Sequence, residues 1–257
     1  MVSFIDCHLS LRRCSPFNGG KFEGWGTSFC WWPNRIGYLD ELSEQAAKLF
    51  FDPKEGLGLN IIRYNIGGGD DPTHHHITRT DSMVPGYAIN PSHDANGYHW
   101  SYDWNADQNQ RNVLMKVAEC YGKDLIVEGF SNSPPYFMTN SGCSSGSVNA
   151  GENNLREDAY GAFASYLADV AQHFSKEWGI HFQSMTAMNE PDTEYWHALS
   201  DKQEGCHFDP GESQSVMIIA LREALDERGL NDILISGTDE TGIDCQINSI
   251  NSLSEVA

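Results

Sequence analysis

The stretch Phe182-Gln-Ser-Met-Thr-Ala-Met-Asn-Glu-Pro191 is a mostly apolar run that ends in an amide, a carboxylate and a proline. The run predicts a buried β-strand, and its polar end is typical of the place where a barrel strand opens to solvent. Four other runs share this pattern, apolar or β-branched first and then polar or glycine. Together they predict five strands, at residues 22–28, 59–66, 125–130, 182–188 and 233–237.

Helical patterns separate these strands. Two of them begin with a predicted capping pair, Asn105 with Gln108 and Asn154 with Glu157. Strands that alternate with helices indicate an α/β fold built around a parallel sheet. The periodicity predicts helices at residues 39–51, 105–122, 154–179 and about 217–229.

Two long connections follow the second and third predicted strands, at residues 67–104 and 131–153. Connections of this length in a compact domain usually carry function. No linker divides the chain, so we expect one domain over residues 21–257, preceded by a segment of uncertain order at residues 1–20.

The composition excludes several classes of partner. The 257 residues carry 36 acidic and 16 basic side chains, for a formal net charge of −20. This charge repels a phosphate backbone, so nucleic acid is not an expected partner. No run reaches the roughly 20 apolar residues of a membrane span, and the first residues do not have the pattern of a signal peptide. The seven cysteines form no CxxC motif, and their odd number leaves at least one unpaired.

Glu190 is the candidate catalytic residue. A glutamate at the polar end of a barrel strand can donate a proton to a glycosidic oxygen. Asn189 beside it would hold the 2-hydroxyl of the sugar, a contact that strengthens in the transition state. The alternative is that Glu190 only caps the following turn, with Pro191 fixing the direction of the chain.

Arg63 is a charge inside the otherwise strand-like segment at residues 59–66. A buried guanidinium needs acceptors, so we expect Arg63 to orient a catalytic carboxylate, or else to form a structural ion pair in the barrel. Aromatic residues near the predicted strand ends could stack on sugar rings. We predict that Trp32 and Tyr136 contact substrate, although such aromatics can equally fill the top of a barrel.

Two motifs suggest other chemistry. His74-His75-His76 lies close to Asp70 and Asp71, but adjacent side chains of a loop rarely converge on one metal ion, so we expect no metal site and assign Asp70 to substrate binding. Gly142-Cys-Ser-Ser-Gly146 matches the pattern of an esterase nucleophile elbow. That elbow requires a strand directly before it and a helix directly after it, and the sequence predicts neither.

Four stretches together resemble glycoside hydrolase family 30, and within it the endo-β-1,6-galactanase type. They lie in order at the ends of successive predicted strands. The stretches are Phe22-Glu-Gly-Trp-Gly-Thr-Ser28, Asn60-Ile-Ile-Arg-Tyr-Asn-Ile-Gly-Gly-Gly-Asp70, Gly129-Phe-Ser-Asn-Ser-Pro-Pro-Tyr-Phe-Met138 and Met185-Thr-Ala-Met-Asn-Glu-Pro191.

The resemblance implies a retaining hydrolase of β-linked glycans on a (β/α)8 TIM barrel, secreted from the cell and without a cofactor. It assigns the acid/base to Glu190 and matches Asn189 and Arg63 to family positions. The family nucleophile follows the seventh strand, and residues 21–257 supply only about five βα units. We therefore expect a partial barrel, truncated at its C-terminus, that lacks the nucleophile. Asp239 and Glu240 follow the wrong strand and are expected to line the groove or to support the structure.

Two hypotheses follow from these observations. The first is a retaining glycoside hydrolase acting on a β-linked polysaccharide, with β-1,6-galactan as substrate and β-1,6-glucan, glucosylceramide-like lipids or xylan as alternatives. The second is a chain that binds carbohydrate without hydrolysing it, because one carboxylate alone does not complete a retaining mechanism. The oligomeric state stays open.

Overall fold

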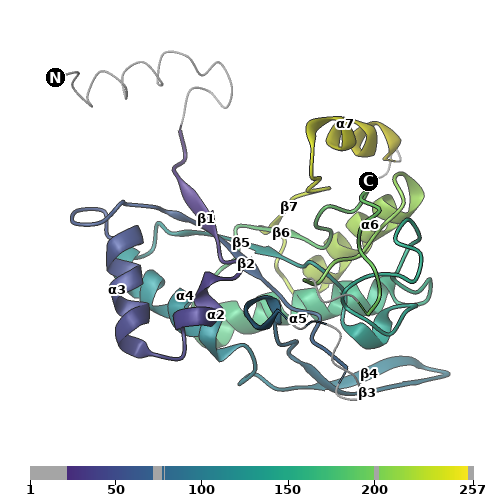
Figure 1. Cartoon of the computed structure of the whole chain (residues 1–257), viewed down its shortest axis with the longest axis horizontal. Coiled ribbons are helices and arrows are strands. Elements are labelled where there is room, and N and C mark those ends of the chain that lie inside the picture. Colours follow the sequence, from purple (N-terminus) through teal and green to yellow (C-terminus); the bar gives the residue numbers. More distant parts are fainter. Residues whose placement is uncertain (1–21, 72–76, 78, 200–202, 254–257) are drawn as a thin grey trace.

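The computed structural model describes residues 22–71, 77, 79–199 and 203–253, which form a parallel sheet flanked by helices (Figure 1). The sheet has five strands in the order β1-β2-β5-β6-β7, and every neighbouring pair is parallel. Each strand falls inside a predicted range. The strands are β1 (Gly26–Ser28), β2 (Ile61–Asn65), β5 (Ile126–Phe130), β6 (Ser184–Thr186) and β7 (Leu234–Ile235).

The four predicted helices connect successive strands of the sheet, and α3, α4 and α5 lie below it in Figure 1. The structure also contains two helices that the sequence patterns do not predict, α2 in the first connection and α7 after the last strand. The helices are α2 (Trp32–Ile36), α3 (Asp40–Phe51), α4 (Gln108–Tyr121), α5 (Tyr160–Trp178), α6 (Glu212–Glu227) and α7 (Ile243–Ser252). None of the helices in the described ranges is both long and apolar enough to cross a bilayer.

Both predicted capping pairs are wrong. Helix α4 begins after Asp107 and helix α5 after Ala159, and neither residue caps its helix through the side chain. Asn154 is instead buried in the preceding loop, where its amide donates to the carbonyl oxygen of Cys143 at 3.2 Å. The predicted ends are close to the observed ones, because Gly122 and Gly179 directly follow α4 and α5.

The long connection at residues 67–104 contains an antiparallel hairpin that the sequence prediction lacks. Strands β3 (Ala88–Asp94) and β4 (Gly97–Tyr102) form it. The sequence does carry the signals, since Asn96-Gly97 is a typical hairpin turn and the residues of β4 alternate between half-buried and exposed near its end. The short 3-10 helices η2 (Thr80–Ser82) and η3 (Tyr136–Met138) lie in the two connections.

The hydrophobic core lies between the sheet and the helices. Alternation along β2 buries Ile62 and Tyr64 on this side, and the Tyr64 ring lies 5.1 Å from that of Phe174 in α5. Arg63 therefore faces the opposite side, which is the inside of the barrel. The sheet thus has an apolar face toward the helices and carries polar groups on its inner face.

Candidate active site

Arg63 organises the inner face of the sheet. Its register partner on β5 is Glu128, and its Nε donates to Glu128 Oε1 at 3.0 Å. Its Nη2 donates to Asn189 Oδ1 at 2.9 Å and to the carboxylate of Asp239. The guanidinium also lies 3.6 Å from the centre of the Phe130 ring. One cation thus connects β2, β5 and the segments that follow β6 and β7.

Asn189 is held in one orientation by this arrangement. Its backbone forms a parallel bridge with Asp239, and its side chain is buried. Because Oδ1 accepts from Arg63, the Nδ2 amide is the group left to donate to a ligand. Among the described residues, no hydrogen bond uses that Nδ2 group. An amide donor fixed in this way is suited to a sugar hydroxyl.

The backbone of Glu190 has a positive φ of 49°, which is uncommon for a residue with a side chain. Hydrogen bonds on both sides hold it there. Its N–H donates to Asp239 O at 2.6 Å, and its carbonyl accepts from Thr193 Oγ1 at 2.7 Å and from Trp196 Nε1 at 3.4 Å. Backbone strain that neighbours enforce in this way tends to cluster at functional sites.

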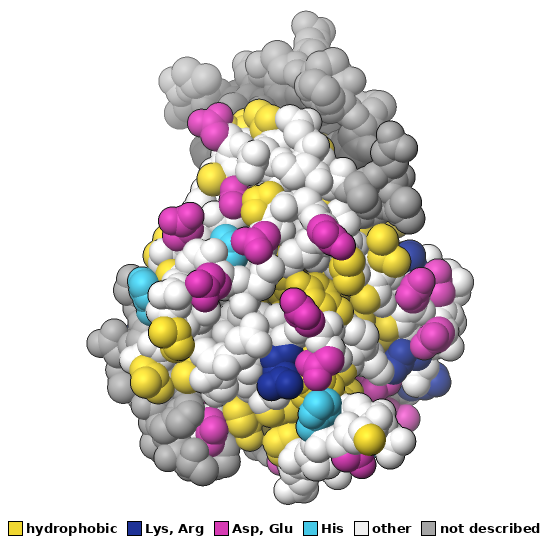
Figure 2. All heavy atoms as spheres, turned by 90° about the vertical axis from the view of Figure 1, so that its right-hand side faces the viewer, with side chains coloured by type: hydrophobic (Ala, Val, Ile, Leu, Met, Phe, Trp, Pro, Cys, Tyr) yellow, Lys and Arg dark blue, Asp and Glu magenta, His cyan; other side chains and the backbone are white. Residues whose placement is uncertain are grey.

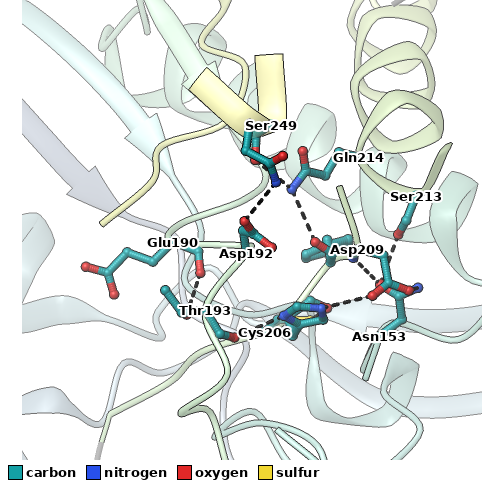
Figure 3. Close-up of polar contacts among 12 residues, drawn as sticks. Asn153, Glu190, Asp192, Thr193, Cys206, Asp209, Ser213, Gln214 and Ser249 are labelled. Carbon is teal, nitrogen blue, oxygen red and sulfur yellow. Dashed lines mark hydrogen bonds and ion pairs between the residues drawn. The ribbon is translucent and has the colours of Figure 1, made fainter. Parts of the chain in front are cut away.

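The side chain of Glu190 points away from the polar cluster around Asp192, Gln214 and Ser249 (Figure 3). One described residue donates to its carboxylate, namely Tyr195, whose hydroxyl lies 2.6 Å from Oε2. Burial first, and this bond second, raise the pKa of Tyr195, which therefore stays protonated as a donor. The Glu190 carboxylate is thus oriented but half-exposed.

Two other acidic residues near Glu190, Asp239 and Glu240, form ion pairs or hydrogen bonds with neighbouring residues. Asp239 pairs with Arg63. Glu240 accepts from Ser249 Oγ at 2.6 Å and from the backbone N–H of Asp192 at 3.1 Å, and burial raises its pKa. That Asp239 and Glu240 line the groove or support the structure stays a prediction.

The structure brings two of the predicted substrate-binding residues together. Asp70 follows β2, and Tyr136 is the first residue of η3. The backbone N–H of Tyr136 donates to the carbonyl oxygen of Gly68, two residues before Asp70, at 3.3 Å. Burial raises the pKa of Tyr136, and the charges of Asp71 and Asp70 raise it further, so the phenol lies near both acids.

Trp32 is placed differently. Its ring packs against Phe29 and Phe50, its Nε1 donates to Ser28 O at 3.1 Å, and it lines an apolar groove of about 740 Å³ beside β1, α2 and α3. These contacts are those of packing. Its predicted contact with substrate stays a prediction that the geometry does not support.

The sequence patterns were not used to identify three residues of this region: Glu128, Tyr195 and Glu204. Glu128 did carry a signal, since it is a charge inside an apolar strand like Arg63. Tyr195 lies five residues after Glu190 and carries no motif. Glu204 is buried, and burial raises its pKa well above the usual range.

No group of three or more His, Cys, Asp or Glu side chains in the described part of the chain could hold a metal ion. The residues His74, His75 and His76 lie outside the described residues. Ser144 of the esterase-like motif is buried in a loop, and its hydroxyl donates to Gly69 O at 2.7 Å. It has neither the strand nor the helix of a nucleophile elbow.

Acidic side chains are spread over the face shown in Figure 2, with few basic ones among them. A neutral ligand fits this surface better than an anion does.

The profile of O-glycosyl hydrolase family 30 matches residues 21–241. The chain belongs to this family. The match confirms the resemblance drawn from the four sequence stretches.

Two curated relatives are similar in sequence. An endo-beta-1,6-galactanase of Hypocrea rufa is 38% identical over 243 residues, which cover 87% of this chain and 48% of the relative. An exo-beta-1,6-galactobiohydrolase of Bifidobacterium longum subsp. longum is 27% identical, over 88% of this chain and 20% of the relative. The chain spans about half the length of the first relative and a fifth of the second.

A solved structure, a conserved exported protein from Bacteroides fragilis, superposes with a TM-score of 0.73 at 26% sequence identity. The superposition covers 85% of this chain and 44% of that protein. The family and the parallel sheet confirm the predicted fold class, with five βα units of a (β/α)8 barrel in the described residues.

Proposed function

We propose that the protein is a glycoside hydrolase that cleaves β-linked galactan, with Glu190 as its acid/base. The observation that carries this proposal is the half-exposed carboxylate of Glu190, held by Tyr195 and by a strained but hydrogen-bonded backbone. It lies beside an amide that Arg63 fixes. An acid next to an oriented donor is the arrangement that protonation of a glycosidic oxygen requires.

In this mechanism Glu190 donates a proton to the leaving oxygen and then, as a carboxylate, takes one from water. The Nδ2 group of Asn189 donates to the 2-hydroxyl, and Arg63 keeps that amide turned toward the sugar. A retaining mechanism needs a second carboxyl group about 5 to 5.5 Å away. The described candidates, Asp239 and Glu240, are bound to other groups. The family resemblance assigns the role of nucleophile to a carboxylate that follows the seventh strand of the barrel.

We infer β-1,6-galactan as the substrate because both curated relatives are named for β-1,6-galactosyl activity. β-1,6-Glucan, xylan and glucosylceramide-like lipids are the alternatives. Asp70 and Tyr136 are the residues that we expect to bind the sugar beside the catalytic pair.

An extracellular location is part of the proposal. The similar Bacteroides fragilis protein is named as exported, and a polysaccharide substrate lies outside the cell. Detection of the protein in culture medium, separated from lysed cells, tests this location.

The experiment that tests the function compares Glu190→Gln with Glu194→Gln. Glu194 is an exposed glutamate of the same loop and serves as the matched control. On β-1,6-galactan, we expect Glu190→Gln to lower turnover about 10²- to 10⁴-fold, the range for loss of a general acid, and Glu194→Gln to leave it unchanged. Equal turnover by both variants, or greater turnover on xylan or β-1,6-glucan, would contradict the proposal.

Sugar binding without hydrolysis is the second candidate for the 257-residue chain. The observation that favours it is that Asp239 pairs with Arg63 and Glu240 accepts a hydrogen bond from Ser249. Among the described residues, neither carboxylate is then left to act as the nucleophile beside Glu190. This candidate predicts that the chain binds β-1,6-galactobiose but releases no reducing sugar from galactan. Release of reducing sugar that depends on Glu190 excludes it.

A further inference from the structure

A cavity of about 220 Å³ lies beside the turn that follows β2. Its apolar wall consists of Ile77, Met83, Val84 and Pro85, and its polar wall consists of Asp70 and Glu204. The cavity is much larger than the roughly 30 Å³ of one water molecule and smaller than the 300 Å³ or so at which pockets for larger ligands begin. Its size therefore suits one small group.

Glu204 is the unusual residue of this cavity. It is 1% exposed, and it belongs to the same connection after β6 that carries Glu190. Its Oε1 accepts from the N–H of Gly68 at 2.9 Å. Its Oε2 is buried with no hydrogen-bond partner among the described residues. A buried polar atom without a partner has a free-energy cost, and a bound ligand would remove it.

The protonation of Glu204 decides what it can bind. Burial raises its pKa well above the usual range, and the nearby charges of Asp107 and Asp70 raise it further. Burial therefore favours the protonated form of Glu204. In that form, with Oε1 engaged by Gly68, Oε2 carries the proton and can donate it to a ligand.

The chemistry of the walls restricts the ligand class. A donor from Glu204 and a carboxylate from Asp70 can share one hydroxyl group, which both accepts and donates. The four apolar residues suit the C–H surface of a sugar. An anion would be repelled by Asp70, and the described residues supply fewer than three ligands of the kind that hold a metal ion.

We propose that this cavity is a subsite for one hydroxyl-bearing group of a β-galactoside, and that Glu204 selects for that hydroxyl. The inference rests on the proposed function, since it names the part of the substrate that the same active-site face would hold. The competing account is that Glu204 only fixes the turn at Gly68.

The test measures binding by the 257-residue chain to methyl β-D-galactopyranoside and to its 2-, 3-, 4- and 6-deoxy derivatives, by ligand-observed NMR titration. We expect the wild-type chain to bind one of the four deoxy ligands about tenfold more weakly, the scale of one good hydrogen bond. Glu204→Gln, whose amide can donate, should keep this discrimination. Glu204→Met should bind the parent sugar about tenfold more weakly and treat that deoxy ligand and the parent alike.

A second measurement needs no destabilising variant. In the wild-type chain labelled with ¹³C at glutamate carboxyls, the Glu204 resonance, assigned by its loss in Glu204→Gln, should shift on addition of the parent sugar. The disfavoured deoxy ligand should leave it unshifted. A purely structural role of Glu204 predicts no shift with either ligand.

Equal affinity of the wild-type chain for all five ligands would overturn the inference, as would undetectable binding or a Glu204 resonance that ignores the sugar. Failure of the proposed function has a different signature, because it is read from turnover by Glu190→Gln and not from binding. The two can therefore fail separately.

Discussion

Asp107 is a buried carboxyl group in a left-handed backbone conformation at the start of α4. It is 4% exposed, its φ is 51°, and its Oδ2 accepts from Tyr64 Oη at 2.5 Å and from Gln110 Nε2 at 2.7 Å. Its Oδ1 has no hydrogen-bond partner among the described residues. Burial raises the pKa of Asp107 from 3.8 to about 7. The folded chain therefore holds this proton more tightly than the unfolded chain does.

This group makes the free energy of unfolding fall as the pH rises from 3.8 to about 7, with no further fall above that range. Asparagine tolerates the left-handed conformation and can accept the same bonds, but it does not titrate. We expect Asp107→Asn to gain stability relative to wild type across that window, by up to about 4 kcal/mol. Urea unfolding of both proteins at pH 4, 5.5 and 7.5 measures the difference. A constant difference would contradict the prediction.

Prediction at the residue scale succeeded where a residue type was unusual for its segment. Arg63 was identified as a charge within a strand, and Glu190 as a carboxylate at a strand end. Glu128 is also a charge within a strand, but the sequence analysis did not use that signal. Tyr195 and Glu204 carry no such signal, because their partners depend on strand register and on loop paths, and no local pattern encodes either.

At the scale of elements, the strands and the main helices followed from periodicity, but the predicted starts of α4 and α5 were wrong. The side chain of Asn154 bonds to Ser141 and Cys143 of the loop before α5, and these contacts outweigh its capping preference. Helix ends were more accurate, because the glycines that follow α4 and α5 take positive φ values that other residues adopt only at a cost.

Replacement by alanine of two glycines at opposite ends of α5 should change the stability of the fold in opposite directions. Gly179 follows α5 with a φ of 68°, and Gly161 lies within α5; a Cβ at either position meets no atom within 4 Å. Gly179→Ala should therefore destabilise by about 1 kcal/mol through its backbone conformation. Gly161→Ala should stabilise by about 0.5 to 1 kcal/mol through helix propensity. Thermal unfolding at one pH measures both, and shifts of the same sign would refute the account.

At the scale of the whole molecule, the excess of acidic residues dominates the electrostatics. The formal net charge is −20, and acidic side chains are spread over the face shown in Figure 2. Like charges repel in the compact state, and salt screens them over a Debye length of about 10 Å at 0.1 M.

We expect the melting temperature to rise by a few degrees, on the order of 2 to 5 °C, when NaCl increases from 10 to 200 mM. Sucrose at matched osmolality serves as the control, since it changes surface exclusion without screening charge. A melting temperature that stays constant or falls with salt, after subtraction of the sucrose effect, would show that repulsion between acidic side chains does not limit the stability of the fold.

The central claim is that Glu190 protonates the leaving oxygen of a β-galactoside. Its most direct test compares kcat/KM of Glu190→Gln and wild type on β-1,6-galactan and on a 2,4-dinitrophenyl β-1,6-galactobioside, whose leaving group departs without a proton. We predict a loss of about 10²- to 10⁴-fold on galactan and of less than about tenfold on the aryl substrate. Equal losses on the two substrates would contradict the claim.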